Sequence, residues 1–223
     1  MSRVEGVWQL ETKPTTVREQ RKAERRQQLL DAAASLFADR GFTSVRLEDL
    51  GAAVGISGPA VYRHFPNKEA VLVELMVGIS EYLLDGGREV VGRAEMNADT
   101  VCALVDFHLD FAFETPAFIR IQDRDLQSLP EGARRKVRRM QREYVELWVE
   151  VLCAVDPDLN ESDARTTAHA VFGLINSTPY SAGRSPSRNA RPVLRAMALN
   201  AVKALTSAPT IRSEDRDPAC GHQ

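Results

Sequence analysis

Cysteine is scarce in this chain, and long hydrophobic runs are missing. Its three cysteines, Cys102, Cys153 and Cys220, are an odd number without paired spacing, which supports neither a disulfide framework nor a zinc site. No stretch approaches the roughly 18 to 20 apolar residues of a membrane helix, and the first residues lack the apolar core of a signal peptide. We therefore expect a cytoplasmic protein with no membrane partner.

Motifs of catalysis and cofactor binding are also missing. The sequence has no glycine-rich phosphate loop, no nucleophile elbow and no His or Cys set with metal-ligand spacing. His169 and His222 have no evident partner in the sequence. These absences argue against an enzyme, and we expect no metal and no cofactor.

The net charge of −2 hides an uneven distribution of basic residues. The segment VREQRKAERRQ, residues 17–27, contains five basic and two acidic residues. Taken alone, such a run is typical of a solvated helix face. At the leading end of a DNA-binding domain it would instead contact the phosphate backbone or the minor groove, through residues that include Arg21, Lys22 and Arg25.

Hydrophobic periodicity predicts an all-α protein, because nothing in the chain alternates like a β-strand. Helices are expected over residues 17–40 and 47–54. Gly55 permits a tight turn, and Ser57 is a natural N-cap for a third helix over residues 58–65. Three helices with a short turn between the second and the third are typical of a helix-turn-helix unit.

The rest of the chain is also predicted to be helical. Asn67 can cap a long helix that fades near Gly86-Gly87, and the later helices are expected over residues 98–114, 116–126, 131–154, 161–178 and 191–205. The pattern divides the chain into a flexible arm (1–16), a helix-turn-helix domain (17–66), a larger helical domain (67–207) and a disordered tail (208–223).

The third predicted helix has an outward face that suits DNA. At about 100° per residue, Val61 and Phe65 point inward, whereas Pro59 and Arg63 point outward. The face is small at its start and basic at its middle, as entry into a major groove requires. The donor fork of Arg63 matches a guanine edge. The alternative, a tight corner with core aromatics, does not need an arginine at the centre of the exposed face.

Neighbouring side chains have complementary roles in this interpretation. Ala60, like Pro59, offers only apolar contact, for instance to a thymine methyl group. Tyr62 and His64 would hydrogen-bond phosphate oxygens, and Lys68 would be a second phosphate anchor at the start of the next helix.

Two successive segments closely resemble a known family. RQQLLDAAASLFADRGF, followed by VRLEDLGAAVGISGPAVYRHFPNKEAVL, is similar to the DNA-binding domain of the TetR family of bacterial transcriptional repressors. The resemblance implies an all-helical homodimer that binds a palindromic operator and releases it when a small molecule enters the C-terminal domain. By position, the DNA contacts of the family fall on Gly58, Pro59, Ala60, Tyr62, Arg63, His64 and Lys68, with further contacts on Val45, Arg46 and Glu48.

Two positions depart from the pattern of that family. Val45-Arg46 stand where most relatives have hydroxyl residues before the second helix, so Ser44 is left as a cap and Arg46 would contact a phosphate through its charge. Pro59 stands where glycine is common. The base preference at these positions therefore cannot be copied from relatives.

Candidate effector contacts combine aromatic residues with arginine. His108 lies on the apolar face of its predicted helix, where it is either a satisfied core residue or a ligand contact. The other aromatic residues either line a cavity or simply pack in a core. The candidate effector-binding residues are His108, Phe111, Phe118, Arg120, Tyr144 and Trp148.

Arginine clusters suggest the chemistry of the effector. Arg120 and Arg124 lie one turn apart, and ARRKVRRMQRE, residues 133–143, opens another helix. Solvated faces explain such clusters. The alternative is an anionic effector with an apolar tail, such as an acyl-CoA, whose phosphates would lie on arginines. In this respect the chain resembles repressors of fatty-acid and branched-chain acyl catabolism.

The helix predicted over residues 161–178 is apolar or small around most of its circumference, which indicates burial on two sides. One side can meet the core of the protomer, and a second copy of the chain would cover the other. The expected homodimer interface comprises Ala168, Phe172, Ile175, Leu194, Ala198 and Val202. Regulation as an activator, or without an effector, remains an alternative to repression.

Overall fold

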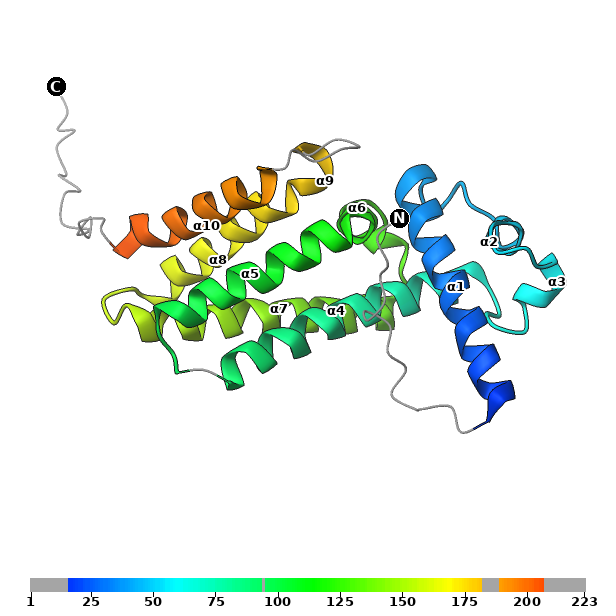
Figure 1. Ribbon diagram of the computed structural model, residues 1–223, viewed down its shortest axis with the longest axis horizontal. Helices are drawn as coiled ribbons and strands as arrows, with labels where there is room; N and C mark the ends of the chain where they lie inside the picture. Colours follow the sequence, from blue (N-terminus) through cyan, green and yellow to red (C-terminus); the bar gives the residue numbers. More distant parts are fainter. Residues whose placement is uncertain (1–15, 94, 182–188, 207–223) are drawn as a thin grey trace, which may run out of the picture.

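The computed structural model describes residues 16–93, 95–181 and 189–206, which fold into helices without strands. Three helices form a small unit at one end (Figure 1): α1 (Val17–Arg40), α2 (Leu47–Ala53) and α3 (Gly58–Val61). The larger unit contains α4 (Lys68–Gly92), α5 (Ala98–Glu114), α6 (Pro116–Asp125), the 3-10 helix η1 (Leu126–Ser128), α7 (Glu131–Val155), α8 (Glu161–Asn176), α9 (Thr178–Ser181) and α10 (Ala190–Thr206). The expected fold class is thereby confirmed.

The predicted N-terminal arm and C-terminal tail cannot be compared with the structure. The arm expected over residues 1–16 lies outside the described residues except for Thr16, and so does the tail expected over residues 208–223. Thr16 is the N-cap of α1, where its hydroxyl accepts a hydrogen bond from the Glu19 amide at 3.2 Å. No helix in the described part of the chain is long and apolar enough to cross a membrane.

Helix α3 is shorter than the sequence predicts. It ends at Val61, and residues 62–64 continue as turns before Phe65. Proline disfavours helical geometry in the residue before it, so Pro66 prevents Phe65 from extending the helix. Ser57 occupies the N-cap position as expected, but its hydroxyl makes no capping hydrogen bond. Asn67 does cap α4, because its side chain accepts from the Ala70 amide at 2.8 Å.

Helix α4 passes through Gly86-Gly87, so the prediction that it fades there is wrong. Both glycines lie against aromatic rings of other helices. A Cβ atom on Gly86 would collide with the ring of Phe107, and one on Gly87 would lie 2.6 Å from Cε2 of Tyr144. The missing side chains therefore permit a close approach of α5 and α7 to α4, and this packing retains the helix despite its two glycines.

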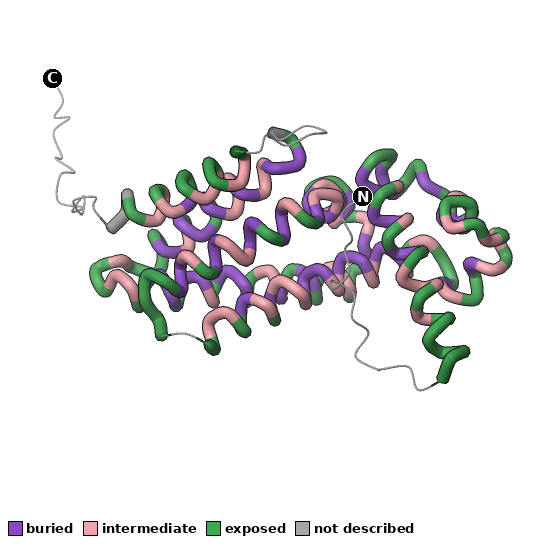
Figure 2. The backbone as a smooth tube through the Cα atoms, viewed as in Figure 1, coloured by how far each residue is buried: buried purple, intermediate pink, exposed green. Residues whose placement is uncertain are grey.

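A continuous core joins the two units. Buried residues line the inner faces of α4, α5, α7 and α8 and extend into α1 (Figure 2). In α1 the buried positions include Leu30, Ala33 and Phe37, which follow helical spacing. The rings of Phe37 and Phe42 meet edge to face with centroids 5.4 Å apart. The helix-turn-helix unit is thus packed directly onto the larger helical unit.

Candidate DNA-binding surface and regulatory core

The outward face predicted for the third helix is exposed in the structure. Tyr62 is 52% exposed, and Pro59 and Arg63 are exposed as well. Val61 and Phe65 are fully buried, so they anchor this segment to the core. Gly58, Ala60 and His64 are half-buried beside the exposed residues. The segment therefore presents one arginine, one phenol and one proline ring to solvent from a fixed base.

Helix α2 contributes an acidic neighbour to this surface. The Tyr62 hydroxyl donates to a carboxylate oxygen of Glu48 at 3.4 Å. A Cβ atom on Gly58 would lie 3.1 Å from Cγ of Glu48, so the glycine allows α2 and α3 to approach each other. Binding of a phosphate by the Tyr62 hydroxyl would have to replace this contact with Glu48.

The start of α2 differs from the expectation. Its N-cap is Arg46, whose side chain is exposed and whose amide donates to Asp49 at 2.8 Å. Ser44 is therefore not the cap. Val45 is fully buried and cannot contact DNA, because its side chain fills the core of the small unit.

Lys68 has structural partners that the sequence did not reveal. Its ammonium donates to the carbonyls of Phe42 at 2.7 Å and Val45 at 2.8 Å, and lies 3.4 Å from that of Thr43. It also lies 4.3 Å from the centroid of the Phe42 ring. Since an ammonium has three protons, its donors are engaged by these carbonyls. This geometry corrects the expectation of a free phosphate anchor: Lys68 ties the loop between α1 and α2 to the start of α4.

The basic residues of α1 separate into an exposed and an inward group. Arg21 and Lys22 are exposed, as a phosphate-contacting role requires. Arg25 is half-buried and donates to the carbonyl of Val54 at 3.1 Å, so this expected DNA contact is instead bound to the end of α2. The inward group also includes Arg26, which was not a predicted site residue.

Arg26 holds the end of the α3 segment. Its guanidinium pairs with Glu74 on α4, donates to the carbonyl of His64 and lies 4.1 Å from the centroid of the Phe65 ring. Helical spacing could have found this role, because Arg26 shares the buried face of Leu30, one turn later. Arg26 therefore fixes the position of the segment that carries Arg63.

His64 is neutral at pH 7 in this setting. Burial lowers its pKa, and the nearby cations Arg26, Lys22, Arg25 and Arg63 lower it further. Its Nδ1 atom is buried without a hydrogen-bond partner among the described residues. Any contact with a phosphate would therefore use a neutral imidazole N–H rather than a positive charge.

Helix α6 connects the larger unit to the C-terminal end of α1. The Arg124 guanidinium donates to the carbonyl of Phe37, lies 3.4 Å from that of Ala38 and contacts the buried carboxylate of Asp125. Asp125 in turn accepts from the Phe42 amide at 3.4 Å. Arg124 thus adds a second hydrogen bond to the Phe37 carbonyl, which also accepts from the Gly41 amide at the end of α1.

Arg120 also lies where α6 contacts α1, and it is not part of the buried core. It donates to the carbonyl of Pro179 at 3.1 Å and lies 3.8 Å from the carboxylate of Asp39 on α1. In the structure its side chain links α1 to α9, and its expected effector contact stays a prediction. Tyr180 adds a second link from α9 by donating to Asp123 on α6 at 3.0 Å.

An aromatic cluster occupies the centre of the larger unit. The His108 ring stacks on Phe172 at 4.8 Å and on Tyr144 at 5.8 Å, and the edge of Trp148 faces it at 6.3 Å. Phe111 lies 5.8 Å from His108. We call His108, Phe111, Tyr144, Trp148 and Phe172 the aromatic cluster. The structure thus brings together four predicted effector residues, while Phe118 is buried on α6.

His108 has partners on both ring nitrogens. Nδ1 lies 3.2 Å from the Tyr144 hydroxyl, and Nε2 lies 3.2 Å from Oδ1 of Asn176. Burial lowers the pKa of His108 to about 4, so the imidazole is neutral at pH 7. Burial also raises the pKa of the Tyr144 hydroxyl, which therefore remains protonated. In this structure His108 is a hydrogen-bonded core residue.

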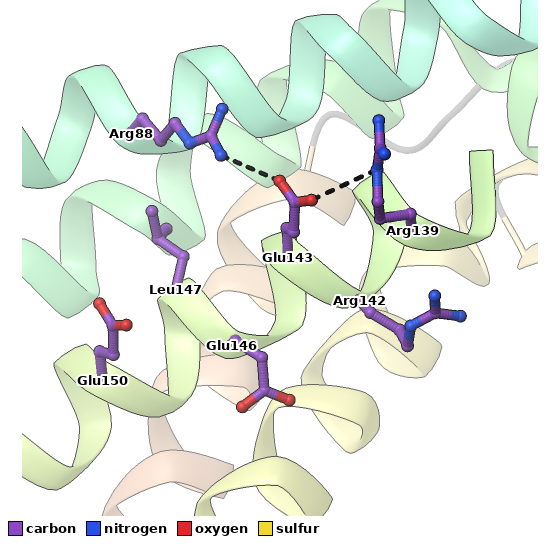
Figure 3. Close-up of a pocket in the computed structure, with 7 residues that line it drawn as sticks. All are labelled: Arg88, Arg139, Arg142, Glu143, Glu146, Leu147 and Glu150. Carbon is purple, nitrogen blue, oxygen red and sulfur yellow. Dashed lines mark hydrogen bonds and ion pairs between the residues drawn. The ribbon is translucent and has the colours of Figure 1, made fainter. Parts of the chain in front are cut away.

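A surface groove lies between α4 and α7 (Figure 3). Its volume is about 600 Å³, and it is lined by Arg88, Arg139, Arg142, Glu143, Glu146, Leu147 and Glu150. Arg88 and Arg139 point toward Glu143, at 3.0 and 3.6 Å, whereas Arg142 points away from it. Within the predicted basic cluster of α7, Arg135, Lys136 and Arg139 pair with acidic side chains.

The predicted dimer residues divide between the core and the surface. Ala168, Ile175 and Ala198 are fully buried within the protomer, so they cannot contact a second copy. Phe172, Leu194 and Val202 are half-buried. The exposed apolar positions of the α8 and α10 pair lie one or two residues away from the predicted ones, and include Ala170, Gly173, Val193 and Met197.

Comparisons with known proteins agree with this architecture. The family model described as bacterial regulatory proteins, tetR family, matches residues 29–75, and the tetracyclin repressor-like C-terminal domain matches residues 95–180. The HTH-type transcriptional repressor KstR2 of Rhodococcus jostii strain RHA1 is 31% identical over 132 residues. These residues cover 59% of this chain and 65% of KstR2, slightly less than two thirds of that relative.

Solved structures share the fold. The ketosteroid transcriptional regulator KstR2 of Mycobacterium tuberculosis superposes with a TM-score of 0.71 at 21% identity, covering 81% of this chain and 94% of that chain. The regulator FadR of Bacillus subtilis, solved in complex with stearoyl-CoA, has a TM-score of 0.62 at 15% identity, covering 81% and 97%. The matched N-terminal and C-terminal domains, in this order on this helical fold, show that the chain belongs to the TetR family of bacterial transcriptional regulators.

Proposed function

We propose that this regulator is a repressor that binds a palindromic operator as a homodimer and releases it when a small-molecule effector binds the larger unit. One observation carries the DNA-binding part of the proposal. Arg63 is exposed at the centre of a segment whose Val61 and Phe65 are fully buried. A guanidinium whose backbone is fixed by buried neighbours can donate two hydrogen bonds to the edge of a guanine.

The other proposed DNA contacts are side chains that are exposed on the helix-turn-helix unit. Pro59 and Tyr62 flank Arg63, Arg46 is exposed at the start of α2, and Arg21 and Lys22 are exposed on α1. In this proposal the last three neutralise phosphates and set the register, whereas the α3 segment reads bases. The protein would act in the cytoplasm, where operator DNA is located.

The palindromic site follows from the proposed dimer. Exposed apolar residues gather on α8 and α10, among them Val193, which is 51% exposed, and Met197, which is 49% exposed. A second copy related by a twofold axis would cover this face. The two α3 segments would then meet two half-sites of opposite orientation, which makes the operator palindromic.

The proposed effector is amphipathic and possesses an anionic part, as an acyl-CoA does. FadR, which shares the fold, holds stearoyl-CoA in its solved structure, and KstR2 is named a ketosteroid regulator. In this chain the apolar part would enter the aromatic cluster, and the anionic part would remain outside near Arg142. Movement of α6 would then pass to α1 through Arg124, and movement of α4 would reach the α3 segment directly.

Arg63→Ala tests the operator contact. Sites selected from genomic fragments by the purified wild-type protein supply the operator, and binding to it and to a mismatched site is then measured at fixed salt. We expect the variant to lose about 1 to 3 kcal/mol of discrimination between the two sites. Arg139→Ala, an arginine of the α4/α7 groove, is the matched control and should retain discrimination. Unchanged discrimination by a folded Arg63→Ala dimer would show that α3 does not read the operator.

A further inference from the structure

The indole N–H of Trp148 is a buried donor without an acceptor. Trp148 is 1% exposed on α7, and its Nε1 atom has no hydrogen-bond partner among the described residues. The Tyr144 hydroxyl, one turn away on the same helix, is near enough to the indole to interact with it, but the two groups do not reach hydrogen-bond geometry. A buried donor is normally paired, because leaving it unpaired is destabilising. Trp148 therefore lacks one acceptor that a ligand can supply.

The neighbouring polar groups already satisfy one another. Oδ1 of Asn176 only accepts hydrogen bonds, so the proton of neutral His108 is on Nε2. Nδ1 of His108 is then an acceptor, to which the Tyr144 hydroxyl donates. Among these groups, the indole N–H is the buried donor that this chain of hydrogen bonds leaves unused.

The aromatic cluster favours an uncharged ligand group. His108 is neutral, since burial lowers its pKa to about 4, and the other members of the cluster are Phe, Tyr and Trp side chains. A carboxylate placed among them would lose its hydration without gaining a cation. A carbonyl oxygen accepts a hydrogen bond at far less cost of desolvation, so it is the group that matches the Trp148 donor.

The ring geometry favours a flat ligand body. Phe172 is tilted by 14° from Tyr144 and by 27° from His108, so these three rings form a near-parallel set. The Trp148 ring stands almost perpendicular to Phe172, at 83°. A planar hydrocarbon body that enters parallel to the three rings would bring its edge toward Trp148.

The α4/α7 groove and the aromatic cluster approach each other at Gly87. Leu147 lines the groove, and its Cδ2 atom would lie 3.3 Å from a Cβ atom on Gly87. The Tyr144 ring lies against the same glycine. Leu147, at the groove, and Tyr144, in the cluster, therefore pack on the same glycine of α4.

We propose that the effector carries a neutral carbonyl group on a flat hydrocarbon body, and that the Trp148 indole N–H donates to this carbonyl. This inference rests on the proposed function, in which the effector binds within the larger unit. It specifies which side chain donates a hydrogen bond to the ligand and which end of the ligand is buried.

Matched probes test the inference on the full-length protein. Binding of 9-fluorenone, fluorene and fluorene-9-carboxylate is measured by calorimetry, with androst-4-ene-3,17-dione as a larger ketone. We expect at least one ketone to bind, and 9-fluorenone to bind about tenfold more tightly than fluorene or the carboxylate. Absence of binding by both ketones, or equal affinity for fluorene and 9-fluorenone, would overturn the inference.

Trp148→Phe removes the donor and retains an aromatic ring. It should abolish the tenfold preference for the ketone, whereas Tyr144→Phe, which alters the same cluster but retains the indole, should preserve it. Because Trp148→Phe also removes buried ring volume, its melting temperature is measured to establish that the variant is folded. A ketone preference that survives in Trp148→Phe contradicts the assigned donor.

A spectroscopic signal covers the case in which Trp148→Phe does not fold. The chain has two tryptophans, Trp8 and Trp148, so Trp8→Phe leaves one indole resonance to follow by NMR. We expect its N–H proton to move downfield with 9-fluorenone and not with fluorene, and an unchanged resonance at saturation overturns the inference. Operator binding by the ligand-free protein is measured in parallel, and its loss would contradict the proposed function instead.

Discussion

Lys68 and Arg63 lie five positions apart, and both were predicted to face DNA. Arg63 is exposed, whereas Lys68 donates to the carbonyls of Phe42 and Val45. The difference arises from the loop before α2, which returns its carbonyls toward the start of α4. At the scale of single residues, the role of a basic side chain is thus decided by acceptors that are distant in sequence.

Lys68→Met tests this structural role. The substitution retains the apolar stem but leaves two carbonyls without their charged donor, so we expect a loss of about 2 to 3 kcal/mol in the free energy of unfolding in urea. The salt dependence of operator affinity should remain that of the wild type for the folded protein. Lys22→Met is the control, since this exposed lysine should leave stability unchanged and reduce the slope of log affinity against log salt by about 1. If Lys68→Met reduced the slope without lowering stability, Lys68 would instead contact a DNA phosphate.

At the scale of helices, α1 ends against α6 rather than in solvent. Its C-terminal carbonyls carry the negative end of the helix dipole, and the Arg124 guanidinium binds two of them, those of Phe37 and Ala38. Gly41, at φ 86°, turns the chain away at this point, and the Arg124 guanidinium packs beside it. The contact couples the orientation of the helix-turn-helix unit to α6.

Arg124→Met should loosen this joint without unfolding either unit. We expect faster amide hydrogen exchange in residues 37–45 and operator affinity about tenfold lower, because α1 is no longer held in one orientation. Arg135→Met is the control, since its exposed pair with Glu131 contributes little. Wild-type exchange in residues 37–45 of Arg124→Met would show that α6 does not restrain α1.

At the scale of the whole molecule, α8 and α10 expose apolar side chains that no other described residue covers fully. Met197 is 49% exposed on this face, and Met96, between α4 and α5, is exposed to a similar degree at 46%. The two methionines allow a comparison in which the substitution is the same and the location differs.

Met197→Asp should weaken the dimer, because its carboxylate would be buried against the partner without a cation. We expect a shift toward monomer in sedimentation at micromolar concentration and a loss of operator affinity of more than tenfold, since each protomer then binds one half-site. Met96→Asp should remain dimeric with unchanged affinity. A Met197→Asp protein that sediments as a dimer would place the interface elsewhere.

The sequence by itself determined the features that depend on local order. Apolar spacing predicts most of the long helices within a few residues, since buried faces recur with the helical period. Turn and cap residues such as Asn67 act on their neighbours in the chain, so their effect is visible in the sequence. The exposed position of Arg63 follows in the same way from the inward positions of Val61 and Phe65.

Tertiary structure alone decided which polar and small residues meet across helices. Gly86 and Gly87 read as a helix end, but the rings of Phe107 and Tyr144 from other helices pack on them and α4 continues. Lys68 donates to carbonyls of the loop before α2, and the Trp148 indole has no hydrogen-bond acceptor within the described ranges. The physical reason is that hydrogen bonding and close packing depend on positions in space, which residues far apart in the chain acquire only when the whole fold has formed.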